Sequence, residues 1–135
     1  ETHDAIRHMR AMRSQIAALS GRLDEEMHAE VVALGQALDS TMTAIEEVLY
    51  QTKLKSNQDM LNYPIRLNNK LAHVGSLAGM GLYRPTAQMM RVRDEMTALI
   101  DVQLERWYAL RDADLPALNA AIRAHEIDLI AVPEE

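Results

Sequence analysis

The stretch that decides the predicted fold reads Leu61-Asn-Tyr-Pro-Ile-Arg-Leu-Asn-Asn-Lys-Leu-Ala-His-Val-Gly-Ser-Leu-Ala-Gly-Met-Gly81. Pro64 fixes φ and has no N–H to donate, which suits the first turn of a helix, and Asn62 is a suitable cap. We therefore predict a helix that starts at about Pro64 and ends at Gly79. Its residues at steps of three and four predict one broad inward face with closely packed glycines, made of two rows: Ile65, Asn68, Ala72, Gly75 and Gly79, and beside them Leu67, Leu71, Val74 and Ala78.

Two adjacent asparagines stand inside this predicted core helix. Asn68 and Asn69 lower helix propensity because their side chains compete for backbone hydrogen bonds. We predict that Asn68, on the inward row, bonds the backbone of the loop at 52–62 and fixes the register of the helix. In the alternative interpretation, Asn69 belongs with Arg66 and Lys70 to a polar patch that contacts a partner.

The composition is typical of a helical bundle. Hydrophobic residues make up 48% of the 135 residues, but aromatic residues only 4%, and phenylalanine is absent. The core must therefore consist of Leu, Ile, Val, Ala and Met. Five glycines and four prolines are few for an all-β protein, which needs frequent turn residues. A chain of this length forms one domain, so we predict a single helical-bundle domain over 1–135.

Apolar stripes at helical spacing predict the remaining elements. Helices are expected over 3–20, from the cap Asp24 to Gln51, from Thr86 to about Leu110, and in a short last segment capped by Asp114. Gly21 is expected to end the first helix in the left-handed conformation. The stripes are broader than a coiled-coil seam. We therefore predict an all-α, antiparallel up-down four-helix bundle, with a short fifth C-terminal helix that caps one end.

Charge and composition exclude several classes of partner. The net charge of −6 argues against duplex nucleic acid, which requires a basic stripe. No apolar run approaches the roughly 18 residues that are needed to cross a membrane. The absence of cysteine excludes disulfides and thiolate metal sites. We expect no nucleic-acid partner and no membrane span.

None of the motifs for chemistry is complete. Glu25-x-x-His28 occurs once, whereas a dinuclear site in a bundle needs a second such motif and two further glutamates. Asp4 and His8 are too few to bind a metal, and the pair His73 and Ser76 lacks a third group to orient it. We predict no catalytic, cofactor-binding or metal-binding residues. Enzymatic function would require two of the carboxylates to face one cleft about 5–10 Å apart, with candidates Glu46, Glu47 and Asp94.

Four segments resemble a known family. They are Leu61-Asn-Tyr-Pro-Ile-Arg-Leu-Asn-Asn-Lys-Leu-Ala72, Tyr50-Gln-Thr-Lys53, Arg84-Pro-Thr-Ala-Gln88 and Asp114-Leu-Pro-Ala-Leu-Asn119. Over about residues 45–123 the chain resembles the C-terminal helical region of large bacterial sortilin-like proteins with BNR (Asp-box) repeats, which are often labelled glycosyl hydrolases. The run Asn62–Leu71 is the most specific part. Met60 stands where the family has proline, which affects only the loop.

The resemblance implies the kind of protein to which this chain belongs, but no catalytic residue within the chain. It implies an upstream β-propeller of the sortilin or sialidase kind in an exported protein, and no catalytic residue in this region. Since the sequence starts at Glu1 without an initiator Met, we expect it to be a C-terminal fragment of a larger protein. We predict a non-catalytic bundle that packs on this propeller or self-associates; the alternative is a part of a glycosyl hydrolase that contributes to glycan binding or hydrolysis. The candidate structural and contact residues are Asn62, Tyr63, Pro64, Arg66, Asn68, Asn69, Lys70 and Tyr83.

Overall fold

The computed structural model describes residues 1–56, 59, 62–80 and 84–127, and this part of the chain is entirely helical or irregular, without strands. The predicted all-α class is confirmed. The helical segments are α1 (Thr2–Ser20), α2 (Ala29–Leu49), α3 (Leu67–Gly79), α4 (Ala87–Ala109), the π-helical turn η2 (Leu110–Asp114) and α5 (Leu115–Ala124). Among the described helices, none combines the length and the apolar character needed to cross a membrane.

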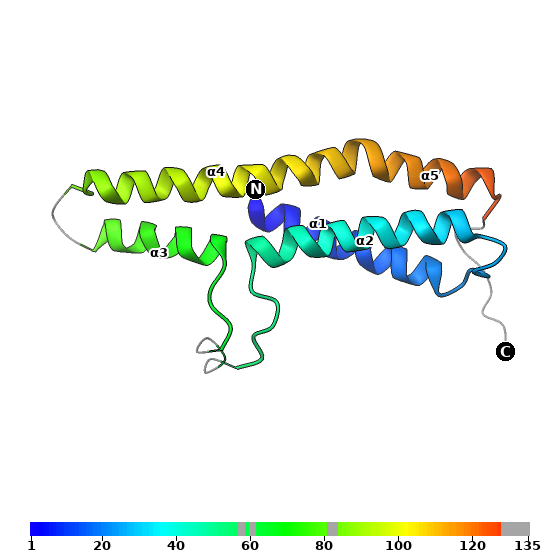
Figure 1. Ribbon diagram of the computed structural model, residues 1–135, viewed down its shortest axis with the longest axis horizontal. Helices are drawn as coiled ribbons and strands as arrows, with labels where there is room; N and C mark the ends of the chain where they lie inside the picture. The colour runs from blue at the N-terminus through cyan, green and yellow to red at the C-terminus, as the bar shows by residue number, and fades with distance from the viewer. Residues whose placement is uncertain (57–58, 60–61, 81–83, 128–135) are drawn as a thin grey trace.

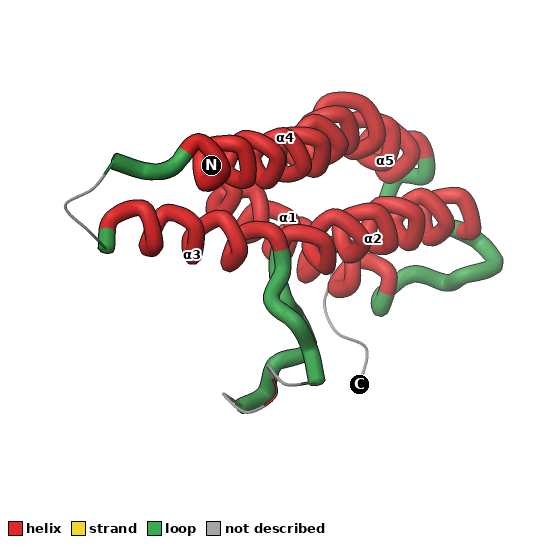
Figure 2. Tube along the Cα trace, turned by 60° about the vertical axis from the view of Figure 1, so that its left-hand side comes forward, coloured by secondary structure: helices red, strands yellow, loops and turns green. Residues whose placement is uncertain are grey.

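The helices form an elongated molecule with two different halves (Figure 1). α4, η2 and α5 make one continuous rod, and α2 and α3 lie end to end along it (Figures 1 and 2). α1 packs against α2 and the second half of the rod, and its N-terminus lies near the middle of the molecule. One half is therefore a three-helix bundle, whereas the other half is the two-helix hairpin of α3 and α4.

The hydrophobic core lies in the three-helix half. Its fully buried side chains include Met9 of α1, Met42 and Ile45 of α2, and Leu110 of η2. Met therefore fills the core at two positions, as the composition predicted. The other core residues are Ala5, Ile6, Val31, Leu38, Leu49, Ile100, Leu104, Trp107, Leu118 and Ala121.

An ion-pair network around the buried Glu46 joins α1 to α2. Glu46 is only 3% exposed, and its two carboxylate oxygens accept hydrogen bonds from Arg10 Nε at 2.7 Å and Arg13 Nη1 at 3.1 Å. Arg13 Nε also donates to Asp39 Oδ1 at 2.7 Å, and this bond raises the pKa of the Arg13 guanidinium. Asp39 and Glu46 are seven residues apart, so both face α1. The network fixes the register of the two helices.

Two predicted helix boundaries are wrong. α3 begins at Leu67 rather than Pro64, because residues 64–66 are not helical, Arg66 is extended, and the Pro64 carbonyl accepts a hydrogen bond from Gln51 Nε2 at 2.8 Å. Asp114 does not cap a separate helix and α5 caps no end of the bundle, because η2 carries the helix on from α4 into α5. The wider π-helical turn accommodates Pro116, which cannot donate a backbone hydrogen bond.

Two further boundaries differ in their local geometry. Gly21 ends α1 as predicted, but in the right-handed conformation with φ −67°. Asp24 Oδ1 accepts hydrogen bonds from the N–H groups of Glu26 and Met27, but this caps a turn, and α2 begins only at Ala29. Thr86 caps α4 through a hydrogen bond from the Met89 N–H at 3.2 Å, close to the predicted start.

The glycines do not pack as predicted. A Cβ added to Gly75 or Gly79 would meet nothing within 4 Å, so the close packing expected for α3 is wrong. Gly35 of α2 is the closely packed glycine: its added Cβ would lie 3.1 Å from Ile16 Cγ2 of α1. The α1–α2 contact therefore depends on a small residue at position 35.

Replacing Gly75 by alanine is expected to stabilise the protein by about 0.5–1 kcal/mol, because alanine has the higher helix propensity and its methyl group meets no neighbour. Thermal denaturation measures the change. Gly35→Ala is the matched control, in which contact with Ile16 should cancel much of the gain. A larger gain at Gly35 than at Gly75 would contradict the packing described here.

Candidate interaction surface

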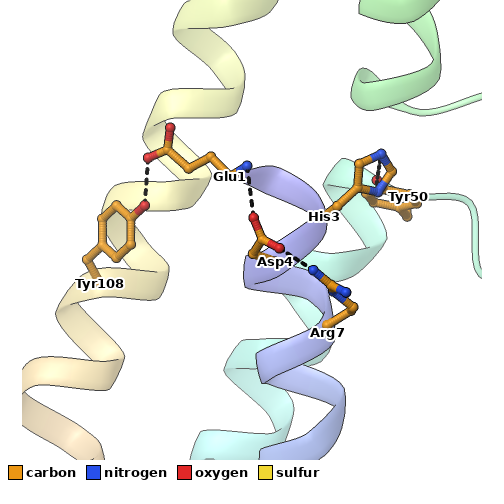
Figure 3. A network of polar contacts seen from close by, with 6 residues as sticks. All are labelled: Glu1, His3, Asp4, Arg7, Tyr50 and Tyr108. Atoms are coloured by element: carbon orange, nitrogen blue, oxygen red, sulfur yellow. Dashed lines mark hydrogen bonds and ion pairs between the residues drawn. The ribbon is translucent and has the colours of Figure 1, made fainter.

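The hairpin of α3 and α4 extends beyond the reach of α1. The carboxylate of Glu1, at the start of α1, accepts a hydrogen bond from the Tyr108 hydroxyl at 2.7 Å (Figure 3). Tyr108 lies 21 residues after the first residue of α4, or about 31 Å along the helix. The first turns of α4 therefore have α3 as their neighbour, and α1 does not cover them.

α3 contains no buried residue. Leu67, Leu71, Val74 and Ala78 are half-buried against α4, whereas Ala72, Gly75 and Gly79 from the predicted inward row are exposed. The prediction that α3 is the core helix is therefore wrong. A helix that packs on one neighbour buries one stripe, and α3 lacks the second neighbour that α1 provides for α2.

A small hollow lies between the two helices of the hairpin. It has a volume of about 230 Å³ and is lined by Val74 and Leu77 of α3 and by Met89 and Val92 of α4, with Thr86 and Gln88 at its edge. This is enough space for one large apolar side chain. The hairpin thus has a receptor site for a protruding residue.

The hollow belongs to a larger apolar surface, which we call the open face and define as Val74, Leu77, Val92, Leu99 and Val102. Leu77, Leu99 and Val102 are 45%, 52% and 50% exposed. Leu99 lies nine residues before Tyr108, or two and a half helical turns, so it projects from the side of α4 opposite α1. The open face is therefore made by apolar residues of both helices.

The predicted contact residues lie in the loop before α3 and along the start of this helix. The N–H groups of Asn62 and Tyr63 donate to the Asp59 carbonyl at 3.0 and 2.8 Å, so Asn62 belongs to a turn and does not cap α3. Tyr63 and Pro64 are exposed. Arg66 is half-buried and precedes α3, and its Nε atom is buried without a hydrogen-bond partner among the described residues.

The two asparagines have different surroundings. Asn68 is half-buried and interacts with the Tyr50 hydroxyl, which also contacts His3 of α1 (Figure 3). Burial raises the pKa of Tyr50, and Asn68 and Arg10 oppose this shift. The polar group beside Asn68 is thus a side chain at the end of α2, and the predicted contact with the loop at 52–62 falls in part on residues 57, 58, 60 and 61, outside the described residues. Asn69 and Lys70 are exposed, and Tyr83 lies outside the described residues.

Asp59 organises the loop between α2 and α3. Its Oδ2 accepts hydrogen bonds from the N–H groups of Lys55 and Ser56 at 2.8 and 2.9 Å, and its Oδ1 accepts one from Ser56 Oγ at 3.1 Å. These bonds, that from Lys55 first, hold the pKa of Asp59 below its ordinary value of 3.8. The charged carboxylate therefore stabilises the turn.

Acid is expected to open this turn. Because the pKa of Asp59 is depressed in the folded loop, its stabilising effect is present above pH 3.8 and is lost as the pH falls through the lower folded value. Amide chemical shifts of Lys55 and Ser56 should therefore move toward disordered values only below about pH 4. In Asp59→Asn these shifts should not respond to acid; a response that survives this substitution would assign it to another group.

The acids of the enzymatic alternative lie in three different settings. Glu46 is buried against two arginines, and Asp94 pairs with its neighbour Arg93 at 2.5 Å on α4, whereas Glu47 is exposed. Each of four hollows on the described part of the chain is lined by one carboxylate at most. The largest of these four has about 310 Å³ and lies between α1 and α5, lined by Met12, Ile16, Leu19, Leu115, Leu118 and Ile122 with a polar edge.

Two of the five histidines, His28 and His125, are neighbours. The rings of His28 and His125 lie 5.8 Å apart, and His125 Nε2 is 3.4 Å from Glu30 Oε2. Asp4, which the sequence placed beside His8, instead pairs with Arg7 and the N-terminal amine (Figure 3). Over the described ranges, no group of three or more His, Asp or Glu side chains is arranged to hold a metal ion.

Sequence reasoning missed the open face. Leu99 continues the apolar pattern of its helix, which predicts an inward position, and only the path of α1 shows that it is exposed. The spacing of seven residues between Val92 and Leu99 could have indicated a second apolar row. The Arg10–Glu46 pair was also missed, although acids at 39 and 46 and arginines at 10 and 13 fall on matching helical steps.

Comparison with protein-family models, curated proteins and solved structures finds no match to this chain. The resemblance to sortilin-like proteins therefore remains a prediction from the sequence.

Proposed function

We propose that this chain is a non-catalytic helical module that assembles a larger exported protein by protein–protein contact. One observation carries the proposal: α3 contributes no buried residue to the core, although it packs along α4. A helix with this little burial adds little to stability, so its surface is the part available for a partner. The three-helix half supplies the rigid support.

The proposed docking surface is formed by the loop before α3 and the outer side of this helix, and is defined by Tyr63, Arg66 and Asn69. Asn69 lies two residues from both Leu67 and Leu71, which face α4, so it projects away from that helix. Tyr63 is exposed at 40%. An exposed aromatic ring beside amide and basic groups is a composition typical of interface residues. The resemblance supplies the proposed partner, an upstream β-propeller of the same polypeptide.

Thiol labelling tests this proposal, because the chain has no cysteine of its own. In Asn69→Cys the new thiol should react several-fold more slowly in the polypeptide encoded by the complete reading frame than in the isolated 135-residue chain. Both are compared at low micromolar concentration. Met27→Cys is the matched control, because Met27 is 73% exposed and lies at the other end of the molecule. Equal reactivity of position 69 in the two proteins would overturn the proposal.

A further inference from the structure

The open face carries charges of both signs among its apolar residues, Lys70 and Glu95 among them. Lys70 lies four residues before Val74 in α3, and Glu95 lies three residues after Val92 in α4, so each projects on the same side of its helix as the apolar residues. Both are exposed. Neither has an ion-pair partner within the part of the chain that the structure describes.

Lys70 and Glu95 also stand at the same level of the hairpin. Val74 and Val92 line one hollow, which fixes the register of the two antiparallel helices. The residues one turn before Val74 in α3 therefore lie beside the residues one turn after Val92 in α4. The basic residue on one helix and the acidic residue on the other form a single polar layer between the hollow and Leu99.

This arrangement is complementary to itself under one two-fold rotation. A two-fold axis parallel to the helices relates two copies without moving any residue along the helix direction. It places α3 of one copy against α4 of the other. Lys70 then faces the partner's Glu95, and the reciprocal contact forms as well, while Leu77 packs at the level of the hollow. An axis perpendicular to the helices would instead bring like charges together, which is unfavourable.

We propose that the open face is the site at which two copies of this chain associate, forming an antiparallel four-helix bundle from two hairpins. The inference rests on the proposed function, because it names one partner of the hairpin, and it uses a different surface from Asn69. With 13 residues in α3, the face is about 20 Å long and about 20 Å wide, or about 400 Å² per copy. Areas this small give weak dimers.

Sedimentation equilibrium of the 135-residue chain tests the association from low micromolar to near-millimolar concentration. The average mass should rise from 15.2 kDa toward twice that value as the concentration increases. Leu99→Asp and Leu77→Asp should keep the chain monomeric. Met90→Asp is the matched control and should leave the association unchanged. Met90 is also exposed, but it lies 18 residues, or five whole turns, before Tyr108. It therefore projects on the same side of α4 as Tyr108, away from the open face. Leu99→Gln replaces Leu99→Asp if circular dichroism shows that the aspartate variant is unfolded.

The two charges give the sharper test. Lys70→Glu alone and Glu95→Lys alone should each weaken the dimer, because each variant brings like charges together. An equimolar mixture of the two variants should associate again, since both contacts between the different chains are then attractive; no effect within one chain can produce this recovery.

Two results would overturn self-association: a monomeric wild-type chain over the whole range, or a mixture that does not recover. If either occurs while Asn69→Cys is protected in the complete polypeptide, the proposed function stands and this inference alone fails. If Asn69→Cys is also unprotected, both fail.

Discussion

Replacing Trp107 by alanine is expected to lower the free energy of unfolding by about 3–5 kcal/mol. Trp107 is only 2% exposed and belongs to the core between α1, α2 and the rod. Its removal leaves a cavity that surrounding helices can fill only in part. Because it is the only tryptophan, urea unfolding is followed by circular dichroism rather than by fluorescence.

Leu99→Ala, eight residues earlier on α4, is the control for this prediction. Leu99 is 52% exposed, so its truncation should cost no more than about 0.5 kcal/mol. Similar losses at the two positions would mean that the hairpin contains a core as well packed as that of the three-helix half.

The double variant Arg10→Met and Arg13→Met should lower the free energy of unfolding by about 3–5 kcal/mol, because it leaves the Glu46 carboxylate buried without a cation. The side chain of Glu46 is 4% exposed, whereas those of Arg10 and Arg13 are 60% and 32% exposed. Chemical denaturation measures the loss. The loss of stability therefore arises because the buried partner, Glu46, remains when its two more exposed partners are replaced.

Glu46→Met should cost less, about 1–2 kcal/mol, because the two arginines can be hydrated and Arg13 retains Asp39. Replacing all three residues by methionine should restore most of the loss of the double variant. A double variant that is less destabilised than Glu46→Met would show that Glu46 reaches water without its arginines.

The helices themselves could be predicted from the sequence, because periodic apolar residues indicate helices wherever they pack. The predicted ranges for α1, α2 and α4 agree with the structure to within a few residues, apart from the start of α2. The start of α3 could not be predicted, because the hydrogen bond between Gln51 and the Pro64 carbonyl joins residues 13 positions apart. Local propensity at Pro64 favours a helix, and this longer-range contact prevents it.

The mutual arrangement of the helices was less predictable. A stripe such as that of α3 shows that one face is apolar but does not show how many helices cover it. Four predicted helices suggested one bundle of four, whereas the chain continues α4 through η2 into α5 and lays α3 beyond the end of α1. The same ambiguity hid the open face, since Leu99 and Trp107 belong to one apolar pattern and only Trp107 is covered.

Hydrogen exchange of the isolated chain, measured by mass spectrometry at low micromolar concentration, tests most directly whether α3 opens independently of the three-helix half. Amides of α3, over Leu67–Gly79, should exchange through local opening, at least about tenfold faster than those of residues 42–49 in α2, which open only with the whole core. Equal protection of the two segments would contradict the account, because it would show that α3 belongs to the same cooperative core as α2.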